Sequence, residues 1–88
     1  MSKKNREFYR QNLTNFEIQI PWKYFVDILV KDYGFEMIRK SGSQRTFVVV
    51  KPQIIFTTHE DKFVHKGDRR KAIQAIEKLK VWKEVDRK

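Results

Sequence analysis

The 88-residue sequence contains no cysteine. It can therefore form no disulfide bridge, no thiolate metal site and no cysteine nucleophile. A small fold without such bridges suits the cytoplasm, where thiols stay reduced. The chain also has no apolar run near the roughly 20 residues that cross a bilayer, and its basic start does not lead into an apolar signal core. These absences predict a soluble cytoplasmic protein that is not inserted into a membrane.

Acidic residues are scarce beside basic ones, with 11 Asp and Glu against 20 Lys and Arg, so the formal net charge is +9. Such a surplus concentrates polyanions around the protein, and nucleic acid is the commonest polyanion in the cytoplasm. A basic surface can equally bind an acidic protein or serve only solubility. Because 40% of the residues are hydrophobic, the chain can bury a core rather than remain a disordered basic tail.

No repeat and no Pro-rich or Gly/Ser-rich segment divides the chain, whose length is that of one small domain. Residues 1–12 are basic with few packable side chains, which predicts a mobile arm or a short surface helix. Residues 13–88 would form a single domain. Within it, Phe16, Ile18 and Ile20 alternate with polar residues, a period of two that favours a short extended segment.

Two helices are expected. The first begins at Pro21, whose fixed φ suits a first helical residue, and ends before Gly34. The second has Asp68 as its N-cap. Its predicted apolar face consists of Ala72, Ile73, Ile76 and Leu79. Residues 81–88 would be a frayed last turn or a tail that packs back through Trp82.

Three strands are predicted between the helices, at residues 35–40, 45–50 and 53–58. A turn at residues 41–43 joins the first two, and Pro52, which lacks a ladder donor, belongs in the second turn. Such short connections make the sheet antiparallel. The order helix, three strands, helix predicts an α+β fold, a two-layer sandwich in which both helices cover one face of the sheet and the other face is free to meet a partner.

Two groups of basic residues are candidate phosphate contacts, one around the first hairpin turn and one from Lys62 to Lys71. Cations at a helix N-terminus oppose the helix dipole, which suggests a compensating anion there. In the turn, the Ser43 hydroxyl can donate to a phosphate or ribose oxygen. Solvated surface charge is the alternative interpretation. The candidate RNA-binding residues are Arg39, Lys40, Ser43, Arg45, Lys66, Arg69, Arg70 and Lys71.

The two histidines, His59 and His65, are candidates for acid-base chemistry, because histidine is the side chain with an unperturbed pKa near neutrality. His59 ends the third predicted strand, whereas His65 lies in a loop. Either can also be a plain surface histidine. Together with Glu60 and Asp61 they show no recognised spacing of metal ligands, so no metal or cofactor is expected. Phosphate-loop, dinucleotide and serine-nucleophile motifs are absent.

The run from Asp32 to Ser43, followed by Phe47, resembles the core of HicA-type toxins, also called the YcfA-like family. In that family a helix ends in Gly-Phe, a strand carries an Arg, and a Gly-Ser-His motif opens the next strand. Ile55 to His59, then Lys66-Gly67 and the basic helix start, resemble the family's third strand, the following loop and its last helix. The resemblance covers about two thirds of the chain, in motifs that are short but occur in the family's order.

This resemblance implies a double-stranded RNA-binding-like fold. It also implies a toxin of a type II toxin-antitoxin module, an endoribonuclease that cleaves messenger RNA and is neutralised by a HicB-type antitoxin. Gln44 stands where the family has its catalytic histidine. An amide cannot take up a proton near neutral pH, and attack by a ribose 2′-hydroxyl needs a base or strong charge stabilisation.

Two outcomes remain open for catalysis: His59 substitutes as the base, or the protein binds RNA without cutting it. The alternative functions are a non-catalytic RNA-binding module on the same fold, which grips a duplex by its shape, and a basic protein-interaction domain. The sequence leaves the oligomeric state open.

Overall fold

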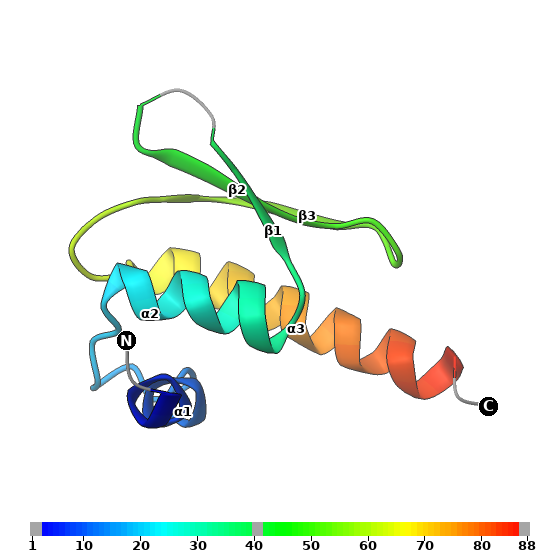
Figure 1. Ribbon diagram of the computed structural model, residues 1–88, viewed down its shortest axis with the longest axis horizontal. Coiled ribbons are helices and arrows are strands. Elements are labelled where there is room, and N and C mark those ends of the chain that lie inside the picture. Colours follow the sequence, from blue (N-terminus) through cyan, green and yellow to red (C-terminus); the bar gives the residue numbers. More distant parts are fainter. Residues whose placement is uncertain (1–2, 40–41, 87–88) are drawn as a thin grey trace.

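The computed structural model describes residues 3–39 and 42–86. Its elements are α1 (Lys3–Gln11), α2 (Trp22–Asp27), the π-helix η1 (Ile28–Asp32), β1 (Glu36–Arg39), β2 (Gln44–Val49), β3 (Ile54–His59) and α3 (Lys66–Asp86). The order from α2 onward confirms the predicted α-β-β-β-α arrangement. Figure 1 shows the sheet as one layer, with α2 and α3 side by side beneath it and α1 below α2. The fold is therefore α+β, as the sequence predicted.

The sheet is antiparallel, with strand order β1-β2-β3. Its register aligns Met37 with Phe47 and Phe47 with Phe56. Because side chains alternate along a strand, Phe47 and Phe56 share the face that meets the helices. Each strand bound differs from the predicted one by one residue, and Pro52 lies in the β2–β3 turn as expected.

The core between the two layers is rich in phenylalanine. Phe25 meets Phe47 edge-on at 5.9 Å between ring centroids, and Phe47 stacks on Phe56 at 5.4 Å. Phe35 meets Phe56 edge-on at 5.6 Å. These are favourable aromatic geometries. On the helix side the core is completed by Leu29, Ala72, Ala75, Ile76 and Leu79. The core thus joins α2, η1 and α3 to the central strand.

The first predicted helix is present, but it changes from an α-helix to a π-helix at Ile28. Pro21 is the residue before α2 rather than its first residue, and the π-helix η1 replaces the last α-helical turns. Gly34 then adopts a φ of 77°. The N–H of Phe35 donates to the carbonyl of Leu29 at 2.9 Å. This closing bond runs across the left-handed glycine and spans six residues, one more than in the Schellman motif that ends an α-helix. It turns the chain into β1.

Of the two alternatives for the N-terminal segment, the structure has the helix. Tyr9 of α1 packs on Tyr24 with 4.9 Å between ring centroids. Asp32 of η1 pairs with Arg6 at 3.3 Å and with Arg10 at 3.5 Å. Because its carboxylate is largely buried, Asp32 ties α1 to η1 more firmly than an exposed pair would.

Two local predictions are wrong. The segment around Phe16 and Ile18 is not extended but forms consecutive turns, because several of its carbonyls converge on the side chain of Arg69. Asp68 is not an N-cap either, since α3 begins two residues earlier. Its carboxylate instead accepts the N–H of His59 at 3.0 Å, which joins the start of α3 to the end of β3.

Candidate functional site

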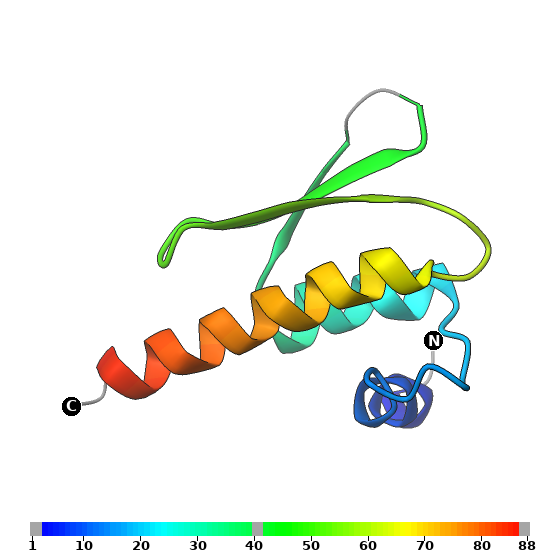
Figure 2. The same ribbon diagram turned by 180° about the vertical axis from the view of Figure 1, so that it is seen from behind.

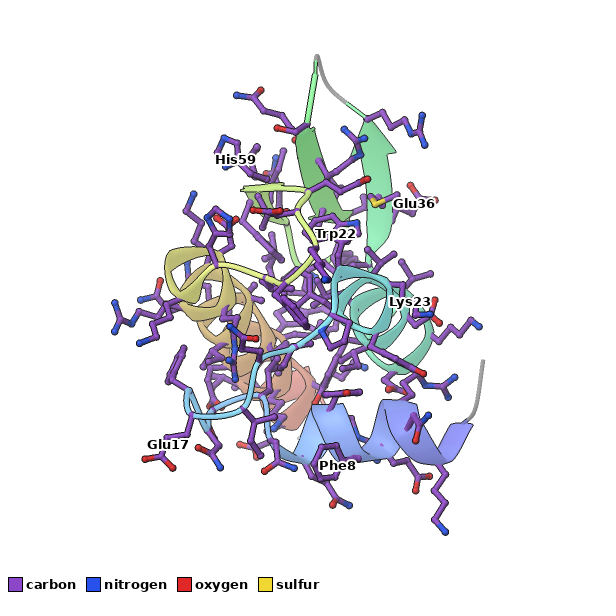
Figure 3. All side chains as sticks on the ribbon, turned by 90° about the vertical axis from the view of Figure 1, so that its left-hand side faces the viewer. Phe8, Glu17, Trp22, Lys23, Glu36 and His59 are labelled. Carbon is purple, nitrogen blue, oxygen red and sulfur yellow. The ribbon has the colours of Figure 1, made fainter. Side chains whose placement is uncertain are left out.

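Most of the predicted site residues that the structure describes lie at one end of the molecule, where the β1–β2 turn, the end of β3 and the start of α3 come together. We call residues 42–45, 59–62 and 65–71 the His59 end. The N–H of Glu60 donates to the carbonyl of Ser43 at 2.8 Å, and Figure 3 shows His59 beside the hairpin. This backbone hydrogen bond therefore fixes the position of the β1–β2 turn next to the end of β3.

Gln44 and His59 are cross-strand neighbours in the β2–β3 register. Directly opposed residues have Cβ atoms about 5 Å apart. By strand alternation both lie on the open face of the sheet, away from Phe47 and Phe56, and both are exposed. An imidazole and an amide thus stand side by side at the solvent-facing end of two strands.

The open face next to this pair combines hydroxyl and apolar side chains. Thr46 and Thr57 face each other with 3.0 Å between their Oγ1 atoms. Ile38 and Ile55 remain 44% and 64% exposed. Among the described helices, none covers this side of the sheet (Figure 1), so a ligand at Gln44 and His59 has access to the open face.

Arg45 follows Gln44 but points the other way and is buried. Its Nη1 donates to the carbonyls of Gly42 at 2.8 Å and of Gln44 at 2.9 Å, and its Nε lies 3.1 Å from Glu60 Oε1. The guanidinium therefore shapes the β1–β2 turn. Arg45 is a positioning residue of this end, and its charge is compensated by Glu60.

Arg69 was predicted to bind RNA on the basic surface, but its side chain is only 2% exposed and is not part of that surface. Its two terminal nitrogens donate at 2.7–3.1 Å to the carbonyls of Asn12, Leu13, Asn15 and Ile18. The guanidinium carbon also lies 4.6 Å from the centre of the Phe16 ring. Burial lowers the pKa of Arg69 from its ordinary value. A forked cation that already serves four carbonyls cannot also contact phosphate.

The sequence contained a signal for this role. Arg69 lies three and seven positions before Ala72 and Ile76, on the same predicted helix face. A charged residue on an apolar stripe is buried only with partners. The partners themselves, carbonyls more than 50 residues away, could not be found from the spacing.

The other predicted contacts are on the surface. Arg39, Ser43, Lys66, Arg70 and Lys71 are exposed. Lys71 Nζ donates to the carbonyl of Thr57 at 3.0 Å, and the Arg70 guanidinium carbon lies 5.5 Å from the Phe16 ring centre. Lys40 lies outside the described residues. The surface cations of the His59 end are therefore Lys62, Lys66, Arg70 and Lys71, and Arg39 is exposed at the end of β1.

His65 forms an exposed pair with Asp61, with 2.8 Å between Nε2 and Oδ2. The hydrogen bond to Asp61 raises the pKa of His65, and the same bond lowers the pKa of Asp61. Both residues lie in the loop between β3 and α3, and His65 directly precedes the first residue of α3. Within residues 3–39 and 42–86, no group of three His, Asp or Glu side chains could hold a metal ion.

The opposite end of the molecule carries an apolar groove that sequence reasoning missed. It encloses about 530 Å³ between the β2–β3 turn and the last turns of α3. Pro52, Ile54, Val81, Trp82 and Val85 line it. Figure 2 shows why it forms: α3 extends past the β2–β3 turn. Trp82 is half-buried there, at a position predicted to be a frayed turn or a tail.

Comparison of the chain with protein-family models, curated proteins and solved structures finds no match. None of the helices in the described part of the chain is long and apolar enough to span a membrane. A functional hypothesis for this protein therefore depends on the residues and geometry of the His59 end.

Proposed function

We propose that this protein binds RNA at its His59 end as a HicA-like toxin of a type II toxin-antitoxin module in the cytoplasm, with a HicB-type antitoxin as its partner. One observation carries the proposal: Gln44 and His59 stand side by side on the open face of the sheet, next to the exposed cations that begin α3. The helix-strand order and the family-like motifs support the same conclusion.

The exposed cations supply the affinity for RNA. Lys66, Arg70 and Lys71 lie on the first two turns of α3, so their charges fall within reach of neighbouring phosphates. Phosphate contacts of this kind position a nucleic acid without reading its sequence. The binding energy then depends on salt, because each neutralised phosphate releases counterions.

Cleavage, if this protein performs it, falls to His59. Its imidazole would accept the proton of a ribose 2′-hydroxyl while that oxygen bonds to the adjacent phosphorus and the 5′-oxygen leaves. Gln44 would hold the hydroxyl or the phosphate by hydrogen bonds. The second candidate function, RNA binding without cleavage, is favoured by the same Gln44, since an amide cannot serve as the base.

The binding test compares two triple variants with the same loss of charge. Lys66→Gln, Arg70→Gln and Lys71→Gln remove cations from the His59 end, and Lys78→Gln, Lys80→Gln and Lys83→Gln remove exposed cations from the end of α3. The triple variant at the His59 end should reduce the steepness of log affinity against log salt by about 2, at about 0.7 per lost single-strand phosphate contact. The triple variant at the end of α3 should keep most of this salt dependence. Equal slopes would contradict the proposed surface, and no RNA retention at low salt would overturn RNA binding.

The catalytic test restores the missing histidine. Gln44→His should create or increase cleavage of single-stranded RNA, measured on labelled transcripts. Any cleavage by the unchanged protein should be lost in His59→Ala and kept in His65→Ala. Cleavage that survives His59→Ala would refute the role of that imidazole. RNA binding with no cleavage by any of these proteins would favour the binding module.

A further inference from the structure

A second hollow lies directly after His59 and is separate from the Gln44–His59 pair. It is an open depression of about 450 Å³, a volume within the range of small-molecule sites. Its lining is almost entirely apolar and is formed by Pro21, Trp22, Lys23, Asp61, Lys62 and Phe63. In Figure 3 Trp22 is seen below His59, at the start of α2 and beside the loop that follows β3.

The walls of this aromatic hollow are held by backbone bonds between two distant segments. The N–H of Trp22 donates to the carbonyl of Lys62 at 3.2 Å, and the N–H of Val64 donates to the carbonyl of Ile20 at 2.9 Å. Pro21 and Phe63 form the antiparallel bridge between these bonds. The two aromatic side chains are therefore brought together before any ligand arrives, which reduces the entropy lost on binding.

The indole of Trp22 is further anchored in the core. Its ring lies 5.6 Å from the ring of Phe25 and 6.2 Å from the ring of Phe47. Trp22 remains half-exposed on the side of the hollow. A rigid aromatic with one free side is the usual stacking platform for an unpaired base.

The rim of the hollow is positive. Lys62 Nζ lies 5.7 Å from the centre of the Phe63 ring, and Lys23 lies on the opposite segment, with its Nζ 5.6 Å from the Tyr24 ring centre. The only acid in the lining, Asp61, is already engaged by His65 at 2.8 Å and by the N–H of Lys62 at 2.7 Å. Two lysines and one carboxylate that is already hydrogen-bonded thus line the hollow, which suits a ligand that is aromatic and anionic.

We propose that the aromatic hollow binds one unstacked nucleobase of a single-stranded RNA, which stacks on Trp22 and Phe63 while Lys23 and Lys62 pair with the flanking phosphates. This inference rests on the proposed RNA binding and adds a preference for unpaired over duplex RNA. The location supports it, since Asp61 and Lys62 follow His59 by only two and three residues. The hollow thus adjoins the end of β3, and an RNA strand bound at the Gln44–His59 pair would continue around this end of the sheet to reach it.

The experiment uses Trp22 as its own reporter. In a Trp82→Phe background Trp22 is the only tryptophan, and its fluorescence is titrated with single-stranded oligoadenylate. The same oligomer with abasic riboses and a matched RNA duplex are the comparison probes. We expect quenching by the single strand and about tenfold weaker binding of the abasic oligomer, a factor typical of one lost base stack.

Two variants sharpen the result. Phe63→Ala should weaken binding of oligoadenylate about tenfold and leave the weaker binding of the abasic oligomer nearly unchanged. Lys62→Gln, which keeps the aromatic walls, should weaken both oligomers alike. Val81→Ala and Lys78→Gln, at the opposite end, are the matched controls. Because Phe63 lies in a backbone bridge, thermal unfolding of each variant checks that the fold is kept.

The outcomes separate this inference from the proposed function. Salt-dependent RNA retention without quenching of Trp22 would overturn the base-binding role of the hollow and leave RNA binding intact. The same holds if Phe63→Ala binds oligoadenylate as tightly as the protein without that change, or if the abasic oligomer binds as tightly as oligoadenylate. Failure of every RNA to bind at low salt overturns the proposed function and the hollow with it. Quenching by an acidic aromatic peptide but not by oligoadenylate assigns the hollow to a protein ligand and overturns the nucleobase.

Discussion

The two ends of α3 differ although both are rich in basic residues. At its start, Asp68 bonds to His59, Arg69 is buried against the 12–18 turns, and Lys71 bonds to Thr57. At its end, Val81 and Val85 are 57% and 66% exposed, because the helix continues past the sheet. The start thus bonds to two other parts of the chain, whereas the end lines an open groove with Pro52, Gln53 and Ile54.

This difference shows that a cation's role is decided by what covers it. Arg69 and Arg70 are adjacent and chemically identical, yet one is 2% exposed and the other lies on the surface. The first holds the N-terminal turns to α3, and the second is free to contact a ligand. The same charge therefore contributes to stability in one position and to the proposed RNA binding in the next.

The largest expected effect comes from Arg69→Met. The methionine fills part of the space but leaves the carbonyls of four residues without their donors, so the free energy of unfolding should fall by about 3 kcal/mol or more. Arg70→Met, the matched neighbour, should cost under about 1 kcal/mol. Urea unfolding followed by circular dichroism measures both. Equal losses would show that the 12–18 turns do not depend on the buried guanidinium.

A smaller effect is expected for Trp82→Ala at the other end of α3. Trp82 is half-buried and lines the groove with Pro52 and Ile54, so removing its ring should lower the free energy of unfolding by about 1–2 kcal/mol. The same urea series measures the loss. A cost as large as that of Arg69→Met would mean that the two ends are equally integrated.

Val85→Ser should change stability by less than about 0.5 kcal/mol, because an exposed methyl group gains little from folding. It should also reduce the apolar area around the groove. A loss of 1 kcal/mol or more in thermal or urea unfolding would show that the end of α3 is covered in solution.

The smallest effect concerns the Asp61–His65 pair. Its hydrogen bond raises the pKa of His65 above the ordinary 6.5, so the pair's contribution is fully present below that pH and is lost as the pH rises through the raised pKa. The lowered pKa of Asp61 has the opposite sign, and its contribution is lost as the pH falls through that value. Proton NMR titration should find a His65 midpoint above 6.5 that returns toward 6.5 in Asp61→Asn. Glu77→Gln is the control, and an unchanged midpoint in Asp61→Asn would contradict the pair.

Much of the fold could be predicted from local patterns. The apolar run Phe47–Val50 marked the central strand, and Gly34 marked the end of the first helix. The antiparallel order of the three strands also followed from the short turns. The wrong predictions are the extended 16–20 segment and the Asp68 cap. Both involve bonds from a side chain to backbone groups of another segment, 51 residues away for Arg69 and nine residues away for Asp68. Spacing along a chain carries no information on such partners.

The sequence by itself determined the α-β-β-β-α order, the basic charge and the absence of a histidine at position 44, because periodicity, turn residues and composition are local properties. Only the tertiary structure decided which cations reach the surface, that Trp22 and Phe63 line one hollow, and that α3 extends past the sheet. The burial of Arg69 and its hydrogen bonds to backbone carbonyls depend on the packing of two segments more than 50 residues apart in the sequence. That packing separates Arg69, which stabilises the fold, from Arg70, which we propose contacts RNA.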